Sequence, residues 1–215
     1  MSPYRAPFGP IRILAVERDW VLVEKPAGLL SVPGRGPEKT DCLVTRLAQP
    51  FGEVFTVHRL DMETSGVMVF ARNARCQAAL SKAFQERRIA KTYEAIVDGM
   101  LAGESGSVDL PLTADWPNRP CQKVCRETGK PSLTHWRLME RGDGWTRVEL
   151  TPHTGRSHQL RVHMMSIGHA ILGDSLYAPP AALRASKRLL LHARALSVFY
   201  ADGAALFDRN CATPF

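Results

Sequence analysis

The chain has 215 residues, of which 45% are hydrophobic and 23% charged, and it carries a net charge of +7. Its length suits one large domain, or one domain with a small extension, and provides ample material for a core. The longest apolar runs have the length of strands and residues 1–18 lack a signal-peptide core, so a membrane-spanning helix and a secretory signal are excluded and a cytoplasmic protein is expected.

The positive charge favours a polyanionic partner, of which RNA and DNA are the commonest. The basic residues recur in clusters, namely Lys82, Arg87, Arg88 and Lys91; Arg119, Lys123, Arg126 and Lys130; and Arg184, Lys187 and Arg188. Several such patches suit a folded ligand with many phosphates better than a small anion.

The five cysteines indicate free thiols, because an odd count in a cytoplasmic protein argues against a disulfide framework. Cys121 and Cys125 are separated by four positions but have no second ligand pair, so structural zinc is not expected.

In chain order, residues 11–25 predict a hairpin, because two apolar runs are broken by a charged pair. Thr40 and Asp41 can cap a short helix that carries Leu43 and Leu47 on one face. Apolar side chains at helical spacing predict an amphipathic helix over residues 74–88.

The β-branched and aromatic content of residues 92–97 predicts a strand. Residues 103–131 are rich in proline, glycine and charge, and are expected to be irregular, forming a binding loop or paired arms. Residues 133–139 and 145–151 predict a second hairpin around a Gly-Asp-Gly turn.

The segment 154–167 predicts a helix with Thr154 as its cap and Gly168 as its terminator. Residues 179–187 indicate another short helix, and 189–207 a closing hairpin. Hairpins and isolated helices without regular βαβ alternation indicate an α+β protein with a largely antiparallel sheet.

Residues 58–66 read His-Arg-Leu-Asp-Met-Glu-Thr-Ser-Gly and precede the apolar run 67–71. A carboxylate in a small-residue turn at the end of a strand is rigidly positioned and still reachable, which suits a reactive Asp61. The ordinary alternative is a surface Arg–Asp pair, since structural ion pairs outnumber catalytic ones.

Residues 153–163 place three histidines and two arginines within eleven positions. On the predicted helix, Arg161 lies one turn beyond Ser157 and His158, so the three side chains are expected on one face. A solvated basic face is the alternative. Metal binding is not supported by the histidine spacing, and no Gly-x-Ser-x-Gly elbow supports a hydrolase.

The segment Lys91-Thr92-Tyr93 opens the strand that follows the amphipathic helix. A core or edge tyrosine is the usual interpretation, but a phenol facing a cleft could stack on a base and hold a proton.

These motifs occur in the order found in the RluA-type pseudouridine synthases, which the chain resembles over nearly its whole length. The resemblance rests on Asp61 in its motif, Tyr93, the Gly-Arg-x-His-Gln-Leu-Arg-Val-His segment, Leu189-Leu190-Leu191-His192-Ala193 and the opening Val23-Glu24-Lys25-Pro26-Ala27-Gly28-Leu29. It implies the fold of this family: a bent, mostly antiparallel mixed sheet flanked by helices, with the active-site cleft across the middle.

The resemblance implies isomerisation of uridine to pseudouridine in RNA without a cofactor or metal. Asp61 would be the essential carboxylate, Arg161 would pair with it, and Tyr93 would stack on the uracil and transfer a proton. Arg59 would fill the gap left by the flipped nucleotide, and Leu190 or Leu191 would pack on the base. The further RNA-binding residues are His58, Arg119, Lys123, Lys130, Arg156 and His158.

Residues 115–131 resemble the short, dual-specificity branch of the family. This implies one catalytic domain over 1–215 with an N-terminal extension at 1–18 and no S4 domain, acting as a monomer. The implied substrates are the tRNA anticodon stem-loop and a 23S rRNA hairpin. Three alternatives remain: an enzyme for only one of these RNAs, a non-catalytic RNA-binding module, and a glycosidase-like hydrolase that pairs Asp61 with Glu63.

Overall fold

The computed structural model describes residues 4–215 and divides them into two compact units. The first unit takes the chain up to residue 91 together with 193–214, and the second takes 92–192 together with 215. The chain passes from one unit to the other inside two strands, β5 (Ile89–Asp98) and β11 (Leu191–Phe199). The single catalytic domain expected over the whole chain stays a prediction.

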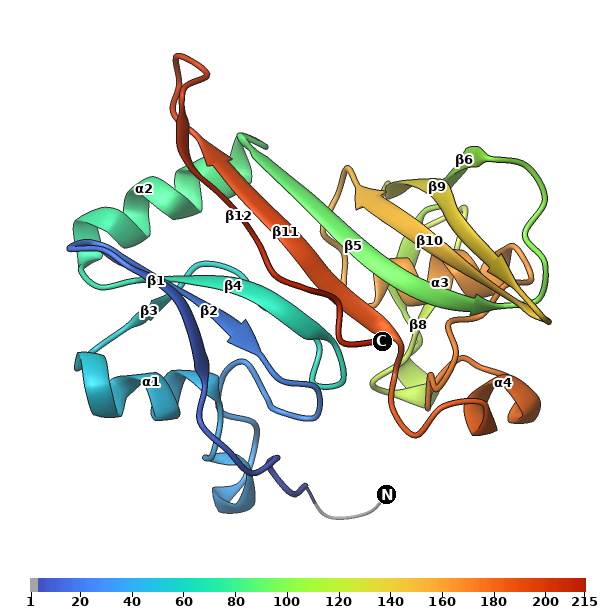
Figure 1. The fold of residues 1–215 in the computed structure, drawn as a ribbon, viewed down its shortest axis with the longest axis horizontal. Coiled ribbons are helices and arrows are strands. Elements are labelled where there is room, and N and C mark those ends of the chain that lie inside the picture. The colour runs from blue at the N-terminus through green and yellow to red at the C-terminus, as the bar shows by residue number, and fades with distance from the viewer. Residues whose placement is uncertain (1–3) are drawn as a thin grey trace. The chain divides into compact units, whose positions relative to one another are not determined.

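The first unit is built on strands from both ends of the sequence (Figure 1). β1 (Arg12–Val16) pairs antiparallel with β2 (Trp20–Lys25), which confirms the first predicted hairpin. β2 pairs antiparallel with β4 (Ser65–Ala71), whose seven residues are all buried.

The short strand β3 (Phe55–Thr56) also pairs with β4. On the other side of β4 lies β11, which pairs antiparallel with β12 (Ala205–Asn210) and confirms the closing hairpin.

Two α-helices accompany these strands, and a hydrogen bond between a side chain and the backbone lies at the start of each. α1 (Leu43–Phe51) follows the 3₁₀ turn η1 (Pro37–Lys39). Its N-cap is Cys42, and not Thr40 or Asp41 as predicted. The Thr45 hydroxyl accepts the Cys42 N–H at 2.9 Å instead. Leu43 and Leu47 are buried, as predicted.

α2 (Ala74–Gln85) starts where the Asn73 side chain accepts the Cys76 N–H at 2.9 Å. It ends before the predicted residue 88, because Arg87 adopts a left-handed conformation with φ 57°. Leu80 and Ala83 pack into a core cluster with apolar side chains of β2, β4 and β11.

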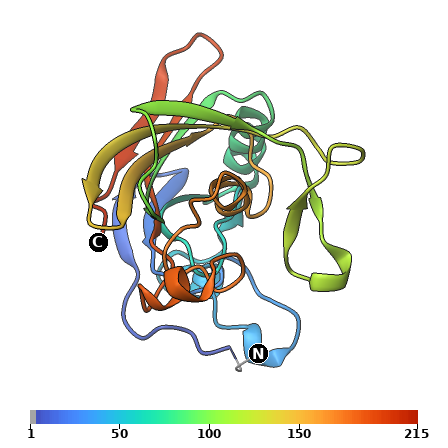
Figure 2. The same ribbon diagram turned by 90° about the vertical axis from the view of Figure 1, so that its right-hand side faces the viewer.

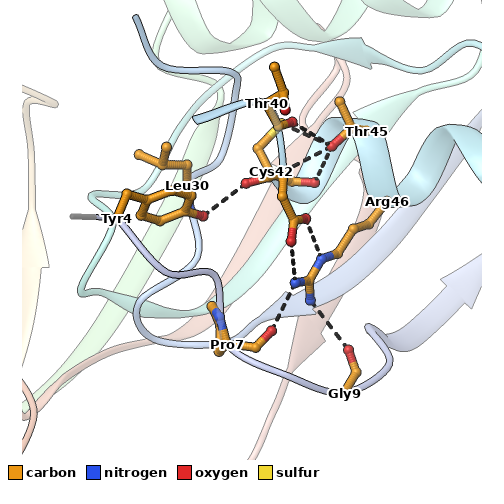
Figure 3. Close-up of polar contacts among 9 residues, drawn as sticks. Tyr4, Pro7, Gly9, Leu30, Thr40, Cys42, Thr45 and Arg46 are labelled. Atoms are coloured by element: carbon orange, nitrogen blue, oxygen red, sulfur yellow. Dashed lines mark hydrogen bonds and ion pairs between the residues drawn. The ribbon is translucent and has the colours of Figure 1, made fainter. Parts of the chain in front are cut away.

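The first described residues are fixed against α1 (Figure 3). The Tyr4 hydroxyl donates to the Asp41 carbonyl at 2.9 Å and accepts the Leu30 N–H at 3.2 Å. The Arg46 guanidinium pairs with the Asp41 carboxylate at 2.7 Å and donates to the Pro7 carbonyl at 2.8 Å. The predicted extension is therefore part of the first unit from Tyr4 onward.

The second unit has an antiparallel succession of strands in the order β5, β10, β9 and β6. β9 (Leu133–Gly142) and β10 (Trp145–Pro152) form the predicted hairpin. β6 (Ser105–Asp109) pairs with β9, so the prediction that this part of the chain is irregular is wrong for residues 105–109.

The rest of the segment 103–131 forms a two-stranded arm. β7 (Leu112–Ala114) pairs antiparallel with β8 (Gln122–Val124), and the 3₁₀ turn η2 (Trp116–Asn118) lies between them. Figure 2 shows this arm, in yellow-green, standing apart from β9 and β10 of the same unit. The expected paired arms are thus present.

The helices of the second unit are α3 (Gln159–Ser166) and α4 (Pro180–Arg184), both shorter than predicted. Leu160 and Met164 of α3 pack with Leu150, Leu189 and Leu191 in the main core cluster of the unit. The α+β class with largely antiparallel strands is therefore confirmed. Among the described residues, no helix has both the length and the apolarity needed to span a membrane.

Candidate active site

Asp61 lies in a turn that the first unit fixes through its backbone. The Asp61 carbonyl accepts the Thr64 N–H at 3.1 Å, and the side chain of Asp61 is half-buried. Immediately before it, the buried Leu60 exchanges hydrogen bonds with Ser31, whose hydroxyl donates to the Leu60 carbonyl at 2.8 Å. A carboxylate on such a fixed turn is positioned without an ordering cost at the moment of binding.

A buried lysine, Lys25, stabilises the same turn through a hydrogen bond to its backbone. Lys25, at the end of β2, has no exposed surface, and its ammonium donates to the carbonyls of Pro26, Leu29 and Met62 at 2.7–2.9 Å. A buried ammonium is tolerated only when its donors are satisfied, and these acceptors come from two separate loops. Lys25 therefore joins the Pro26–Leu29 turn to the residue that follows Asp61.

Gly66 begins the strand that leaves the Asp61 turn. Its φ is 124°, and a Cβ there would collide with the backbone of Ala193 in β11. The Thr-Ser-Gly end of the motif is thus required by close packing of two strands within the first unit.

His58 and Arg59 precede this turn but differ in surroundings. The His58 Nε2 accepts the Val69 N–H at 3.1 Å, and the ring stacks on Phe84 with centroids 4.8 Å apart. Burial, helped by the charge of Lys91, lowers the pKa of His58 to about 3. His58 is therefore a neutral structural acceptor, whereas Arg59 is exposed. Their predicted contacts with RNA stay predictions.

In the second unit, Arg161 is buried and forms a bidentate ion pair with Asp174. The Arg161 Nε lies 2.8 Å from one carboxylate oxygen of Asp174, and Nη2 contacts the other. The Asp174 carboxylate also accepts the N–H groups of Leu176 and Tyr177. Both charged side chains are at most 3% exposed, so the alternative of a solvated basic face is wrong for Arg161.

The prediction of a helix starting at Thr154 is wrong. Helix α3 starts at Gln159, and His158 before it is left-handed with φ 54°. The Gln159 side-chain oxygen accepts the Thr154 hydroxyl at 2.7 Å and the Arg156 N–H at 3.0 Å, which holds the chain in a loop. Ser157 and His158 therefore lie outside the helix and do not share a helical face with Arg161.

The sequence did not point to Asp174 or Tyr177, and of these Tyr177 connects the start of α3 to the arm. The Tyr177 hydroxyl lies 2.6 Å from His158 Nδ1 and accepts the Gln122 N–H of β8 at 2.8 Å. Its ring also lies 5.2 Å from the Arg161 guanidinium. Burial raises the pKa of Tyr177 to about 12, so the hydroxyl keeps its proton. The only sequence signal for Asp174 and Tyr177 was their place after the apolar pair Ile171-Leu172 and a glycine.

Tyr93, Leu191 at the start of β11 and Leu190 just before it contribute apolar surface to the second unit. Tyr93 pairs in register with Leu150 of β10 and, half-buried, packs against the main core cluster. Leu191 is buried in that cluster, whereas the half-buried Leu190 also contacts a second cluster that contains Ile96 and Leu172.

Four basic residues of the second unit that were assigned to RNA are exposed, and three of them, Arg119, Lys123 and Arg156, have contacts within the unit. Lys123 pairs with Asp115 at 3.1 Å, and the Arg119 guanidinium stacks on the Trp116 ring. Arg156 donates to the Pro131 carbonyl at 3.2 Å, and Lys130 is exposed beside β7.

The structure thus brings together Arg161, His158 and the arm through Asp174 and Tyr177, all within the second unit. It brings together His58, Arg59 and Asp61 in one loop of the first unit. The predicted pair of Asp61 and Arg161 joins residues of different units and stays a prediction.

The comparisons with known proteins agree with these motifs. The family described as RNA pseudouridylate synthase matches residues 19–166. The dual-specificity RNA pseudouridine synthase RluA of Vibrio vulnificus (strain CMCP6) is 51% identical over 206 residues, covering 93% of this chain and 82% of the relative. The protein of the same name from Escherichia coli (strain K12) is 48% identical over 200 residues, covering 92% and 91%.

Solved structures give the same result for the fold. Human RNA Pseudouridylate Synthase Domain Containing 1 matches 98% of this chain and 87% of its own with a TM-score of 0.82 and 27% identity. Human RNA Pseudouridylate Synthase Domain Containing 4 matches 94% and 88% with a TM-score of 0.73 and 26% identity. The chain therefore belongs to the RNA pseudouridylate synthase family and is an isomerase that acts on RNA.

Proposed function

We propose that this enzyme has dual specificity and isomerises uridines in both the tRNA anticodon stem-loop and a hairpin of 23S rRNA. The observation that carries the proposal is the 51% and 48% identity, over more than nine-tenths of the chain, to relatives named dual-specificity synthases. The resemblance of residues 115–131 to the short branch of the family supports it. Both RNAs are cytoplasmic, and we place the enzyme there as a monomer.

Asp61 is the catalytic carboxylate in this proposal. Its half-buried side chain lies on a turn that Thr64, Ser31 and Lys25 hold in place. A fixed carboxylate of this kind can attack the sugar or the base, or remove a sugar proton.

Arg161 serves as the cationic partner of Asp61 and favours its ionised form. A guanidinium has five N–H donors, and the contacts to Asp174 use Nε and Nη2, so a second acceptor suits its chemistry. Tyr93 stacks on the uracil, Leu190 or Leu191 packs on its other side, and Arg59 fills the gap left by the extruded nucleotide.

The reaction breaks the bond between N1 and the ribose carbon, turns the ring, and joins C5 to the same carbon. The proton on C5 is lost and N1 gains one, so no oxidant or reductant is needed. The walls around the base must keep the free ring from leaving during this sequence.

The first experiment tests the reaction and the role of Asp61. Release of tritium from C5-labelled uridine in RNA is measured for the wild type, Asp61→Asn and the matched control Glu63→Gln. We expect tritium release with the wild type and the control, and none with Asp61→Asn, because an amide cannot carry the carboxylate's charge. The variant Asp61→Asn should bind RNA with largely unchanged affinity, because the amide can still form hydrogen bonds where the carboxylate did.

Full activity of Asp61→Asn would contradict the assigned role. Release of free uracil in place of pseudouridine would show a hydrolase, with Glu63 as the second acid. Dual specificity is tested by mapping pseudouridines in total RNA from a strain that lacks the gene. Both the tRNA position and the 23S rRNA position should lose the modification. Sedimentation of the purified protein tests the monomer.

A further inference from the structure

The arm carries a large aromatic side chain that the reaction does not use. Trp116 in η2 is 66% exposed, whereas Trp20 and Trp136 are buried in the two cores. Exposing an indole forgoes the gain from burying it, so its position outside a core points to a binding role.

The turn that presents Trp116 is held by several local contacts. The Asp115 N–H donates to the Cys121 carbonyl at 2.9 Å, and the Asn118 N–H donates to the Asp115 carbonyl at 3.0 Å. The Asp115 carboxylate also accepts the Asn118 amide and pairs with Lys123. Trp116 is therefore presented on a preorganised turn, which lowers the entropy lost when it binds a ligand.

One face of the indole is already covered. The Arg119 guanidinium carbon lies 3.3 Å from the centroid of the Trp116 ring. A ring that is stacked on one side and still 66% exposed presents its other face to solvent.

The charge around this stack selects the kind of ligand. Arg119, Lys123, Arg126 and Lys130 are exposed on the same arm, against the acidic Asp115 and Glu127. An open aromatic face beside a surplus of cations fits a nucleotide, whose base stacks on the ring while its phosphate meets the cations.

We propose that the open face of Trp116 stacks on an unpaired base in the RNA hairpin loop, at a nucleotide other than the uridine that is isomerised. This inference rests on the proposed function and deepens it. Arg119 stacks on the opposite face of the indole and donates a hydrogen bond to the phosphate of the stacked nucleotide. The arm thereby distinguishes a loop, whose bases unstack at little cost, from a continuous duplex.

The test compares Trp116→Ala and Trp116→Phe by their affinity for a synthetic anticodon stem-loop and for a fully paired duplex of the same length. All binding is measured in the full chain carrying Asp61→Asn. We expect Trp116→Ala to weaken hairpin binding roughly tenfold, because one base–aromatic stack is lost, and Trp116→Phe to retain most of the affinity. Duplex binding should change less than twofold in both variants.

A control and a coupling experiment complete the test. Tyr200→Ala, which removes another exposed aromatic side chain, should leave hairpin affinity unchanged. Abasic sites placed in turn along the loop, at every nucleotide except the target uridine, should weaken the parent at one position, and at that position Trp116→Ala should cause no further loss.

Equal hairpin affinity of Trp116→Ala and its parent would overturn the inference and leave the indole to a protein partner. An equal loss on hairpin and duplex, or the absence of coupling at every abasic position, would overturn it as well. Absence of pseudouridine formation by the wild type would instead refute the proposed function. The binding experiment measures affinity alone, so its result does not depend on that activity.

Discussion

At the scale of single residues, Asp174 satisfies the buried charge of Arg161. Asp174→Asn keeps the shape but removes the counter-charge, and we expect it to lower the free energy of unfolding by about 3–5 kcal/mol. Urea unfolding followed by circular dichroism measures this. Glu104→Gln is the matched control, because the Glu104–Arg141 pair is exposed and its loss should change stability little. Equal effects of the two variants would show that Asp174 does not satisfy a buried charge.

His58 gives a second prediction at this scale. Its pKa of about 3 in the folded protein, lowered by burial, lies below the value of 6.5 for an unburied histidine. The unfolded state therefore binds the proton more tightly, so this contribution to stability is full above pH 6.5 and is lost as the pH falls toward 3.

We expect the wild type to lose stability below pH 6.5 with a slope from His58 approaching about 1.4 kcal/mol per pH unit. In His58→Gln, the amide oxygen can still accept the Val69 N–H but does not titrate. Chemical unfolding at several pH values should show a shallower decline for this variant, and identical slopes would contradict the assignment.

At the scale of elements, Tyr177 fixes the arm to the start of α3. Tyr177→Phe leaves the Gln122 N–H without its acceptor, which costs about 1 kcal/mol or more. We expect amide hydrogen exchange at Gln122 to accelerate several-fold, and the KM for RNA to rise more than kcat falls. Tyr200→Phe, at an exposed position, should leave this exchange unchanged. Unaltered exchange at Gln122 in Tyr177→Phe would show that the hydroxyl does not hold the arm.

At the scale of the whole molecule, the net charge of +7 predicts that affinity for RNA falls steeply with salt. The logarithm of the affinity should fall linearly with the logarithm of salt concentration. Lys130→Gln should reduce the slope by about one if Lys130 contacts a phosphate. Arg12→Gln is the control, because Arg12 already pairs with Glu24 at 2.8 Å. A slope that is flat for the wild type would contradict the role of the basic patches.

The sequence anticipated the elements that local patterns encode. The 11–25 and 133–151 hairpins follow from apolar runs on either side of charged or turn residues, and α2 follows from the helical spacing of its apolar residues. The motifs around Asp61 and Tyr93 are sufficient to identify the family from the sequence alone, because their order along the chain is specific.

Other features were not encoded locally. Thr154 has the chemistry of a helix cap, yet the Gln159 side chain occupies its hydroxyl and delays α3 by five residues relative to the prediction. The prolines of residues 103–131 suggested irregular chain, but pairing with β9 turns residues 105–109 into a strand.

The sequence by itself determined the α+β class, the family and the order of its motifs, because hydrophobic period and turn chemistry are properties of neighbouring residues. Only the tertiary structure decided how the charges are used: Lys25 binds three loop carbonyls, and Arg161 binds Asp174 thirteen positions away. A charge can be buried only where distant segments supply its partners, and those partners cannot be identified from the residues beside it.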